Sequence, residues 1–412
     1  MKEKSYPKPI SSFKYSDWLF FVPFLALTFF YLFRVPIGQT PDEPAHLNYI
    51  EYLVKFFSLP DYSGSGVAHH PPLYYLIQAP IYAVFNNVYV LRFFSIIFSL
   101  LNLIVIKNLV MIIFPNESQE PDLALGTAIF CSLVPMYNFM SVAVSNDLSA
   151  CLLGSLLIYF TILSLNFSFQ KKDFIFWCLT FLAAIFTKIV LWPMVFISGL
   201  VVFFTQKEKR SSCLIIFALA GIELFSWFYH NVSLYGKWDL LGWGELMKVE
   251  YQLVGNRLIF DNTREWLVLL FHSFWGIFGW FAVYLPLVVY SIIRKSTVIF
   301  LLPFIVFIQH FFKTAGKTQK ISMLIFSSFL VIIFLALVKD NFNFFHPHGR
   351  YLFPVISIIG FYYSASIYQI AKLISKICFG TDKSIVFYSL ILVPLVALNI
   401  ISAITINNFF LK

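Results

Sequence analysis

Charged residues are scarce in this sequence. Only 12% of its 412 residues are Asp, Glu, Lys or Arg, whereas soluble domains carry about 25%. Hydrophobic residues make up 59% of the chain and aromatic residues 20%, including 51 phenylalanines. A soluble fold of this length could not bury so much apolar surface. The composition therefore excludes a soluble globular protein and indicates that lipid is the solvent.

Paired cysteines and internal repeats are also missing. The five cysteines are scattered and none forms a C-x-x-C pair, which argues against a thiolate metal site and a disulfide framework. The chain has 29 basic and 20 acidic residues, a net charge of +9. No basic stripe with interleaved aromatic residues accompanies this excess, so we expect no nucleic-acid partner. Lys and Arg in the cytoplasmic loops of a membrane protein account for the charge instead.

Long apolar runs follow one another along the chain. A spanning helix needs about 20 apolar residues, and candidate spans lie at 17–34, 90–113, 122–139, 147–165, 174–188, 189–205, 212–230, 320–338, 351–370 and 385–409. We expect the stretch 266–312 to cross once, with a long helix from about Tyr284 to Phe312. A cytoplasmic turn at Arg294 and Lys295 would instead require extra crossings. The predicted fold class is an all-α polytopic membrane protein with about eleven transmembrane helices.

Basic residues also set the predicted orientation. Lysines precede the first apolar run and no small-x-small cleavage site follows, so we expect an uncleaved first helix with a cytoplasmic N-terminus. The chain then divides into a cytoplasmic tail, 1–16, and a single transmembrane domain, 17–412. The main extracytoplasmic loops of this domain are 35–89, which should contain interfacial helices, 231–265 and 339–350.

The stretch TPDEPAH places acidic residues where the chain leaves the first span. Thr40, Pro41 and Glu43 fit a capping box, with Thr40 as N-cap and Pro41 at the first helical position. That structural interpretation explains Glu43, explains Asp42 only as a helix-dipole partner, and does not require His46 or Glu51. The functional alternative is a carboxylate that orients or deprotonates an acceptor hydroxyl. Glu-x-x-His is also a metal-ligand spacing, so a divalent metal is an open possibility.

Further polar residues lie in the expected outer segments. His69 and His70 precede two prolines and either begin a helix or line the same cavity as Asp42. Asp147 begins a span and is either its cap or a second carboxylate facing Asp42. Glu223 lies inside an apolar run, where an ionisable side chain is a functional hypothesis by default.

Three basic residues also fall at outer helix ends. Lys188, Arg92 and Arg350 either meet lipid headgroups or bind a phosphate, and His348 fits either interpretation. Together with the acidic and histidine residues, they suit a substrate that has an anionic phosphate and a lipid tail. The basic residues would hold the phosphate, and a carboxylate would activate the acceptor.

Several short motifs resemble the GT-C superfamily of integral-membrane glycosyltransferases. PDEPAHLNYIEYL is similar to the Asp-Glu loop of its mannosyltransferase branches, and SNDLSA and FTKIVL to the second acidic site and the Thr-Lys site. HHPPLYYLI and LRFFSIIFS resemble segments of protein O-mannosyltransferase-like and aminoarabinose-transferase-like members. PDEPAH, SFWGIFGW and GRYLFP together look most like a bacterial GT-C-related family of largely unassigned substrate. The aminoarabinose-transferase-like members often continue into a soluble C-terminal domain, whereas this sequence ends in an apolar run.

The resemblance implies a function. It implies transfer of a sugar, with inversion, from a polyprenyl-phosphate donor to a lipid, glycan or protein acceptor. The protein is expected to lie among the lipids of a bacterial plasma (inner) membrane, with the reaction on the extracytoplasmic side. The expected roles are catalysis for Asp42 and Glu43, acceptor positioning for His46, Asp147, His69 and His70, and donor-phosphate binding for Arg350, Lys188, Arg92 and His348. Metal use stays open, because the superfamily has metal-dependent and metal-independent members.

Two other classes of function remain. A lipid-linked glycan flippase or transporter would also face a lipid phosphate, but most charged residues lie at expected outer helix ends and the sequence shows no repeat of the kind common in transporters. A non-catalytic membrane subunit fits if Asp42 is only a helix cap.

Overall fold

The structure is a computed structural model that describes residues 14–114, 120–236, 238–244, 262–342, 345–377 and 382–411. Most of the expected cytoplasmic tail 1–16 lies outside these ranges, as do parts of the expected outer loops 231–265 and 339–350. Statements below refer to the described residues.

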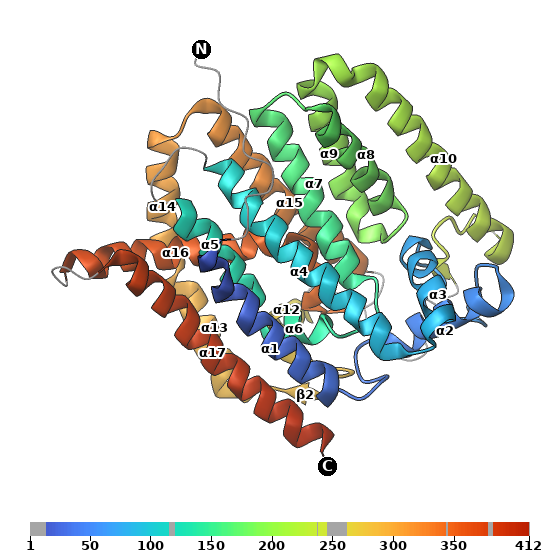
Figure 1. The fold of residues 1–412 in the computed structure, drawn as a ribbon, viewed down its shortest axis with the longest axis horizontal. Helices are drawn as coiled ribbons and strands as arrows, with labels where there is room; N and C mark the ends of the chain where they lie inside the picture. The colour runs from blue at the N-terminus through green and yellow to red at the C-terminus, as the bar shows by residue number, and fades with distance from the viewer. Residues whose placement is uncertain are drawn as a thin grey trace.

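The described chain is almost entirely helical (Figure 1). Its α-helices are α1 (Trp18–Arg34), α2 (Glu43–Phe56), α3 (Leu73–Phe85), α4 (Val88–Ile113), α5 (Glu120–Ser132), α6 (Pro135–Met140), α7 (Asp147–Asn166), α8 (Lys171–Ile185), α9 (Trp192–Thr205), α10 (Arg210–Tyr235), α12 (Thr263–Gly276), α13 (Leu287–Ile299), α14 (Leu301–Thr314), α15 (Lys317–Asn341), α16 (Ile356–Ile377) and α17 (Lys383–Phe410). The 3-10 helices are η1 (Tyr15–Asp17), η2 (Ile189–Leu191), η3 (Lys207–Lys209) and η5 (Gly349–Val355), and β1 (Ile277–Phe278) pairs antiparallel with β2 (Val283–Tyr284).

Eight helical segments within the described ranges are long and apolar enough to cross a membrane. They match eight of the eleven expected spans, and the other three fall on the shorter helices of the segments α5–α6, α8 and η2–α9. The expected single crossing near the end of 266–312 corresponds to Leu287–Thr314, in which α13 and α14 follow each other with a break at Phe300. Arg294 and Lys295 lie inside α13, so the alternative of a turn at these residues is wrong.

The centre of the bundle is the pair α4 and α7, against which α5, α9 and α15 also pack. Tyr137 of α6 ties this centre together, because its hydroxyl donates to the Ser99 carbonyl at 2.9 Å and accepts from the Asn102 amide at 3.0 Å. Near the C-terminal end of α4, Lys107 forms an ion pair with Asp17 at 2.6 Å. Asp17 directly precedes α1, so the start of α1 lies beside the end of α4 and the two helices run antiparallel.

The short helices α2 and α3 lie together at one end of the bundle, the end at which α17 also ends (Figure 1). They enclose a small core of their own that includes Tyr49, Ile50 and Tyr75. At this same end η5 packs against α7, where the Gly154 Cα comes so close to Pro354 that an added Cβ would lie 2.7 Å from the Pro354 carbonyl oxygen. This close approach fixes η5, and with it Arg350, beside the start of α7.

Candidate functional site

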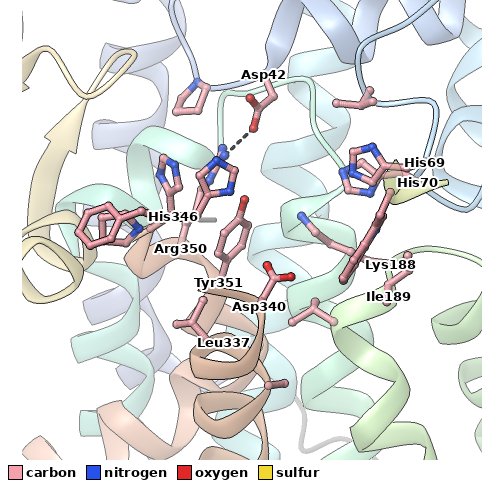
Figure 2. Close-up of a pocket in the computed structure, with 18 of the residues that line it drawn as sticks. Asp42, His69, His70, Lys188, Ile189, Leu337, Asp340, His346, Arg350 and Tyr351 are labelled. Atoms are coloured by element: carbon pink, nitrogen blue, oxygen red, sulfur yellow. Dashed lines mark hydrogen bonds and ion pairs between the residues drawn. The ribbon is translucent and has the colours of Figure 1, made fainter. Parts of the chain in front are cut away.

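A cavity of about 880 Å³ opens at the end of the bundle that carries α2 and α3. Its wall combines the turn before α2, the loop before α3, η2 and α9, the tip of the β1–β2 hairpin, the end of α15 and the segment 345–351. Figure 2 shows Asp42 above Arg350 and Tyr351, with Lys188, His69 and His70 on the other side. Segments far apart in the sequence therefore converge on one cavity.

Much of the rest of the lining is apolar. It includes Ile189, Val190, Trp192, Leu241, Leu269 and Leu337. A cavity with charged groups at one part and hydrophobic side chains at another fits a ligand that is both anionic and lipidic.

Asp42 is held in an unusual backbone conformation. It is the N-cap of α2 with φ 62° and ψ 0°, the left-handed region that few non-glycine residues adopt. Its side chain makes no capping hydrogen bond. Instead, Arg350 Nη2 donates to Asp42 Oδ2 at 2.5 Å. Backbone strain of this kind is found at functional sites, and here it turns the carboxylate toward the cavity.

The electrostatic surroundings keep Asp42 ionised. Burial raises the pKa of this carboxyl, but the charge of Arg350, with His46 and the Arg350 hydrogen bond, outweighs burial and holds the pKa well below its usual value. The side chain is still 37% exposed. Asp42 is thus an anion that a ligand in the cavity can reach.

The expected capping box is wrong. The helix begins at Glu43, not at Pro41, and Thr40 Oγ1 is buried without a hydrogen-bond partner. Glu43 accepts from the Gly38 amide at 2.7 Å and the Val144 amide at 3.2 Å. The structural reason is that Glu43 points into the interior, where stronger partners than the helix N-terminus are available.

Glu43 and Arg92 form a fully buried, bidentate ion pair. Arg92 donates from Nε and Nη2 to the two Glu43 oxygens at 2.8 and 2.7 Å, and both side chains are 0% exposed. Arg92 also donates to the carbonyls of Val35 and Pro36. The pair joins α4 to the chain segments directly before and after Asp42. It therefore supports the turn that carries Asp42, and both side chains are bonded to other parts of the protein.

Asp147 lies between two basic side chains. It forms an ion pair with Lys188, and its Oδ2 is 3.5 Å from Arg350 Nη1. The four charges therefore alternate in the order Lys188, Asp147, Arg350, Asp42. The interpretation of Asp147 as a simple side-chain cap of α7 does not hold, since its carboxylate faces these cations.

Arg350 has a donor to spare. Its side chain is only 3% exposed, yet Nε has no hydrogen-bond partner, and Nη1 has only the ion-pair contact with Asp147 at 3.5 Å. Buried polar groups are normally satisfied, so a guanidinium that lines a cavity with its donors incompletely used fits an acceptor that is supplied by a ligand. The Tyr351 ring packs against both cations, 5.5 Å from Arg350 Cζ and 5.6 Å from Lys188 Nζ.

Histidine rings form a second group in and behind the lining. His46 is buried, and its Nδ1 lies 2.8 Å from the Tyr75 hydroxyl. Its ring is stacked with His70 at 5.8 Å, and His70 lies 4.1 Å from His69. Burial lowers the pKa of His46 to about 4 and of His69 to about 3, against the opposing charge of Asp42. His69 and His70 line the cavity, whereas His46 is not part of the lining and contacts the His70 ring.

His348 lies on the opposite part of the lining, next to the hairpin. Its ring meets Phe281 edge-on at 4.5 Å, and burial together with the Arg350 charge holds its pKa well below the usual value. The neighbouring Trp280 donates from Nε1 to the Gly38 carbonyl at 3.0 Å. The hairpin thereby ties the segment before Asp42 to the segment before Arg350.

Three lining residues were missed by sequence reasoning. Asp340 and Lys339 end α15, and Tyr351 follows Arg350. Figure 2 shows Asp340 below Tyr351, at the far part of the cavity from Asp42. The stretch KDN could have indicated these residues, because it places a carboxylate at the start of the expected outer loop.

The donor set does not fit a divalent metal. Within the described ranges no group of three or more His, Cys, Asp or Glu side chains could hold a metal ion. Asp42 and Asp147 are paired with cations. Glu43 and His46, the candidate Glu-x-x-His ligands, bond to Arg92 and Tyr75 instead.

Glu223 lies apart from this cavity. It is half-buried in the middle of α10, and its Oε2 has no hydrogen-bond partner. The structure gives it no catalytic contact.

Comparisons with known proteins identify the fold. Neither a family model nor a curated protein matches the chain. Solved structures of an oligosaccharyltransferase from Archaeoglobus fulgidus do match it. One, in complex with zinc and sulfate, matches 94% of this chain with a TM-score of 0.53 and 11% identity. The apo form gives 0.53 at 12% identity. The complex of the enzyme, AglB, with an inhibitory peptide and a dolichol-phosphate gives 0.51 at 12% identity.

The likeness has a defined extent. The chain spans 53–56% of the length of these matched chains. At 11–12% identity the likeness shows the fold alone. The expected all-α polytopic membrane fold is confirmed, with a helical bundle similar to that of these oligosaccharyltransferase structures, while the expected number of about eleven spans stays a prediction.

Proposed function

We propose that this protein is a membrane glycosyltransferase that moves a sugar from a polyprenyl-phosphate donor to a lipid, glycan or protein acceptor. The reaction takes place on the extracytoplasmic side of the plasma (inner) membrane of a bacterium and inverts the anomeric carbon. The observation that carries the proposal is Arg350, a buried guanidinium with its donors incompletely used at a cavity that also holds the Asp42 carboxylate. The GT-C-type bundle and the dolichol-phosphate bound in one AglB structure support it.

The donor phosphate is assigned to the basic side of the cavity. Arg350 offers the charge of its guanidinium and an Nε without a partner, and Lys188 lies on the same lining. Positive charge aimed at the leaving phosphate stabilises the negative charge that develops as the bond to the sugar breaks. The apolar lining near Ile189 and Leu337 suits the first units of the lipid.

The acceptor is assigned to the side of Asp42. Its exposed carboxylate contacts the acceptor hydroxyl and takes up its proton. The hydroxyl oxygen attacks the anomeric carbon as the polyprenyl phosphate leaves with the electrons of the broken bond. Asp147 positions Lys188 and Arg350 through its two ion pairs. His46 positions the His70 ring, and His348 supports the Arg350 segment beside Phe281.

The proposal assigns two expected site residues differently. Glu43 and Arg92 were expected to serve as a substitute carboxylate and a phosphate ligand. Their mutual pairing at 0% exposure supports a structural role instead, holding the turn that presents Asp42.

The alternatives make a different demand on Asp42. A lipid-linked glycan transporter or a non-catalytic subunit does not need a carboxylate that is exposed and held in a left-handed conformation. A transferase also releases the lipid phosphate of its donor, whereas a transporter or a non-catalytic subunit does not. Dependence of activity on Asp42 therefore separates catalysis from scaffolding, and release of polyprenyl phosphate separates catalysis from transport.

The test compares surface glycans and lipid-linked sugars in a deletion strain, its wild-type rescue and an Asp42→Asn rescue at matched expression. Asn accepts the left-handed conformation, so this change removes the charge and leaves the turn. Glu51→Gln, at an exposed carboxylate on the same helix, is the control. We expect the deletion and Asp42→Asn to lose one sugar and accumulate its polyprenyl-phosphate donor. Full rescue by Asp42→Asn would exclude the catalytic role and favour transport or scaffolding.

A further inference from the structure

Two basic side chains lie on the lipid-facing surface of a membrane span. Arg294 and Lys295 are neighbours in α13, inside the span Leu287–Thr314, of which only 6% of the most apolar part is buried. Both side chains are exposed. Charged residues within membrane spans almost always face the interior of the bundle, where other polar groups pair with them. These two point away from it.

The described part of the chain supplies no counter-ion for either cation. All ion pairs among the described residues are formed by other side chains, and neither Arg294 nor Lys295 has a further interaction with the protein. A charge next to hydrocarbon is costly when it has no partner. The counter-ion therefore has to come from outside the bundle.

The two cations do not mark the end of the apolar surface. Arg294 is the eighth residue of α13, about 10 Å from the start of the helix. Exposed apolar side chains precede the cations, at Val288 and Ile292, and follow them, at Val298 and Ile299. A basic residue at the end of a span can extend its side chain outward to the headgroups. Here hydrophobic surface continues on both sides, which favours a headgroup bound at the cations themselves.

The neighbours of Arg294 fix the position of this surface. Tyr290, one turn earlier on α13, donates its hydroxyl to the Gly276 carbonyl at 2.5 Å, and its ring stacks on His272 of α12 at 3.9 Å. Burial and then the charge of Arg294 lower the pKa of His272, so the guanidinium lies near this ring as well. One turn earlier on α12, Leu269 lines the cavity. The cations therefore lie at about the level of the cavity along the bundle.

We propose that Arg294 and Lys295 form a binding site for one anionic glycerophospholipid, such as phosphatidylglycerol. Its phosphate oxygens accept hydrogen bonds from the forked guanidinium and from the ammonium group. Its acyl chains lie along the exposed apolar face that continues through Leu302 and Ile305. Because the two cations are exposed and lie outside the lining of the cavity, a lipid of the surrounding bilayer reaches them by lateral diffusion. The site uses none of the residues assigned to sugar transfer.

The test is native mass spectrometry of the purified protein in detergent, with phosphatidylglycerol, phosphatidylcholine or polyprenyl phosphate added at matched concentrations. The wild-type protein is compared with the double variant Arg294→Gln/Lys295→Gln and with each single variant. The matched control is Lys171→Gln/Lys172→Gln, which removes another pair of adjacent, exposed basic residues at the start of α8. The measured masses give the kind and number of lipids bound and the number of protein chains in each complex.

We expect the wild-type protein to bind one phosphatidylglycerol in preference to phosphatidylcholine. The double variant should bind phosphatidylglycerol at least about 10-fold more weakly, because it loses two cations next to the phosphate. Each single variant should show a smaller loss, and the control variant should bind as the wild-type protein does.

Three results would overturn the proposal. Unchanged affinity in the double variant, or an equal loss in the control variant, would show only a general attraction between basic residues and anionic lipid. Preference of this site for polyprenyl phosphate over phosphatidylglycerol would exclude the glycerophospholipid. A wild-type oligomer that the double variant separates into single chains would assign the cations to a protein partner. None of these measurements requires sugar transfer, so they test the lipid site even if the proposed function fails.

Discussion

Arg350 and Asp42 are 308 positions apart in the sequence and share a hydrogen bond of 2.5 Å. The contact joins the first of the expected outer loops to the last one. The guanidinium also faces Asp147, so a single side chain connects three separate segments at the cavity.

Arg350→Lys tests the forked geometry of this side chain. Lysine keeps the charge but has a single donor position, so it cannot meet Asp42, Asp147 and a phosphate together. We expect sugar transfer to fall by about 100-fold or more, with the protein still folded. Arg264→Lys, at an exposed position of α12, is the control. Transfer at the wild-type rate by Arg350→Lys would remove Arg350 from the donor site.

Glu43→Gln tests the structural role of the buried pair. The change leaves the Arg92 charge buried without a counter-ion, which costs about 3–5 kcal/mol of stability. We expect a much lower melting temperature in detergent, and Arg92→Met should have a similar effect. The folded fraction should retain its affinity for the donor. If Arg92→Met instead weakens donor binding in a protein of normal stability, Arg92 belongs to the phosphate site.

Stability should fall as the pH falls below about 6.5. The pKa of His46 is near 4 in the folded protein and about 6.5 in an unfolded chain. Between these values the unfolded state binds a proton that the folded state does not, so each pH unit lost destabilises the fold by about 1.4 kcal/mol for this group. Asp42, whose pKa is also lowered, acts in the same direction at lower pH.

The measurement is the melting temperature from pH 7.5 to pH 5 for wild-type protein and His46→Gln. The variant should show a shallower decline, because glutamine cannot titrate. Parallel curves would show that His46 does not titrate as described.

Gly349→Ala tests the contact that fixes the Arg350 segment. A Cβ at this position would lie 2.2 Å from the Phe274 backbone nitrogen and 2.4 Å from its Cα, and backbone atoms of α12 cannot move aside easily. We expect destabilisation of about 3 kcal/mol or more and loss of transfer. Gly221→Ala is the matched control, since an added Cβ meets nothing within 4 Å there. A stable, active Gly349→Ala protein would show that the η5 segment is not fixed at this point.

The fold class could be predicted from the sequence because hydrophobic runs determine helices in lipid. The spans around α1, α4 and α7 appear in the sequence as long apolar stretches. The short β1–β2 hairpin was not predicted. The run SFWGIFGW is as apolar as a span, and only Gly279 and Phe281, both with positive φ, show where the chain turns back.

The candidate site was predicted in part. Membrane side alone indicated that Asp42, Asp147, Lys188 and Arg350 belong together. Their positions in the sequence could not distinguish the role of Arg350 from that of Arg92, because both fall at expected outer helix ends. The difference is tertiary: Glu43 turns inward to meet Arg92, whereas the neighbouring Asp42 turns outward because its backbone is left-handed.

The alternating charges of Lys188, Asp147, Arg350 and Asp42 sum to zero. Four ions can therefore stand together in a largely buried wall without leaving a net charge there. Replacing one of them by a neutral residue leaves an odd charge, and a phosphate that enters this wall makes the sum negative until it departs.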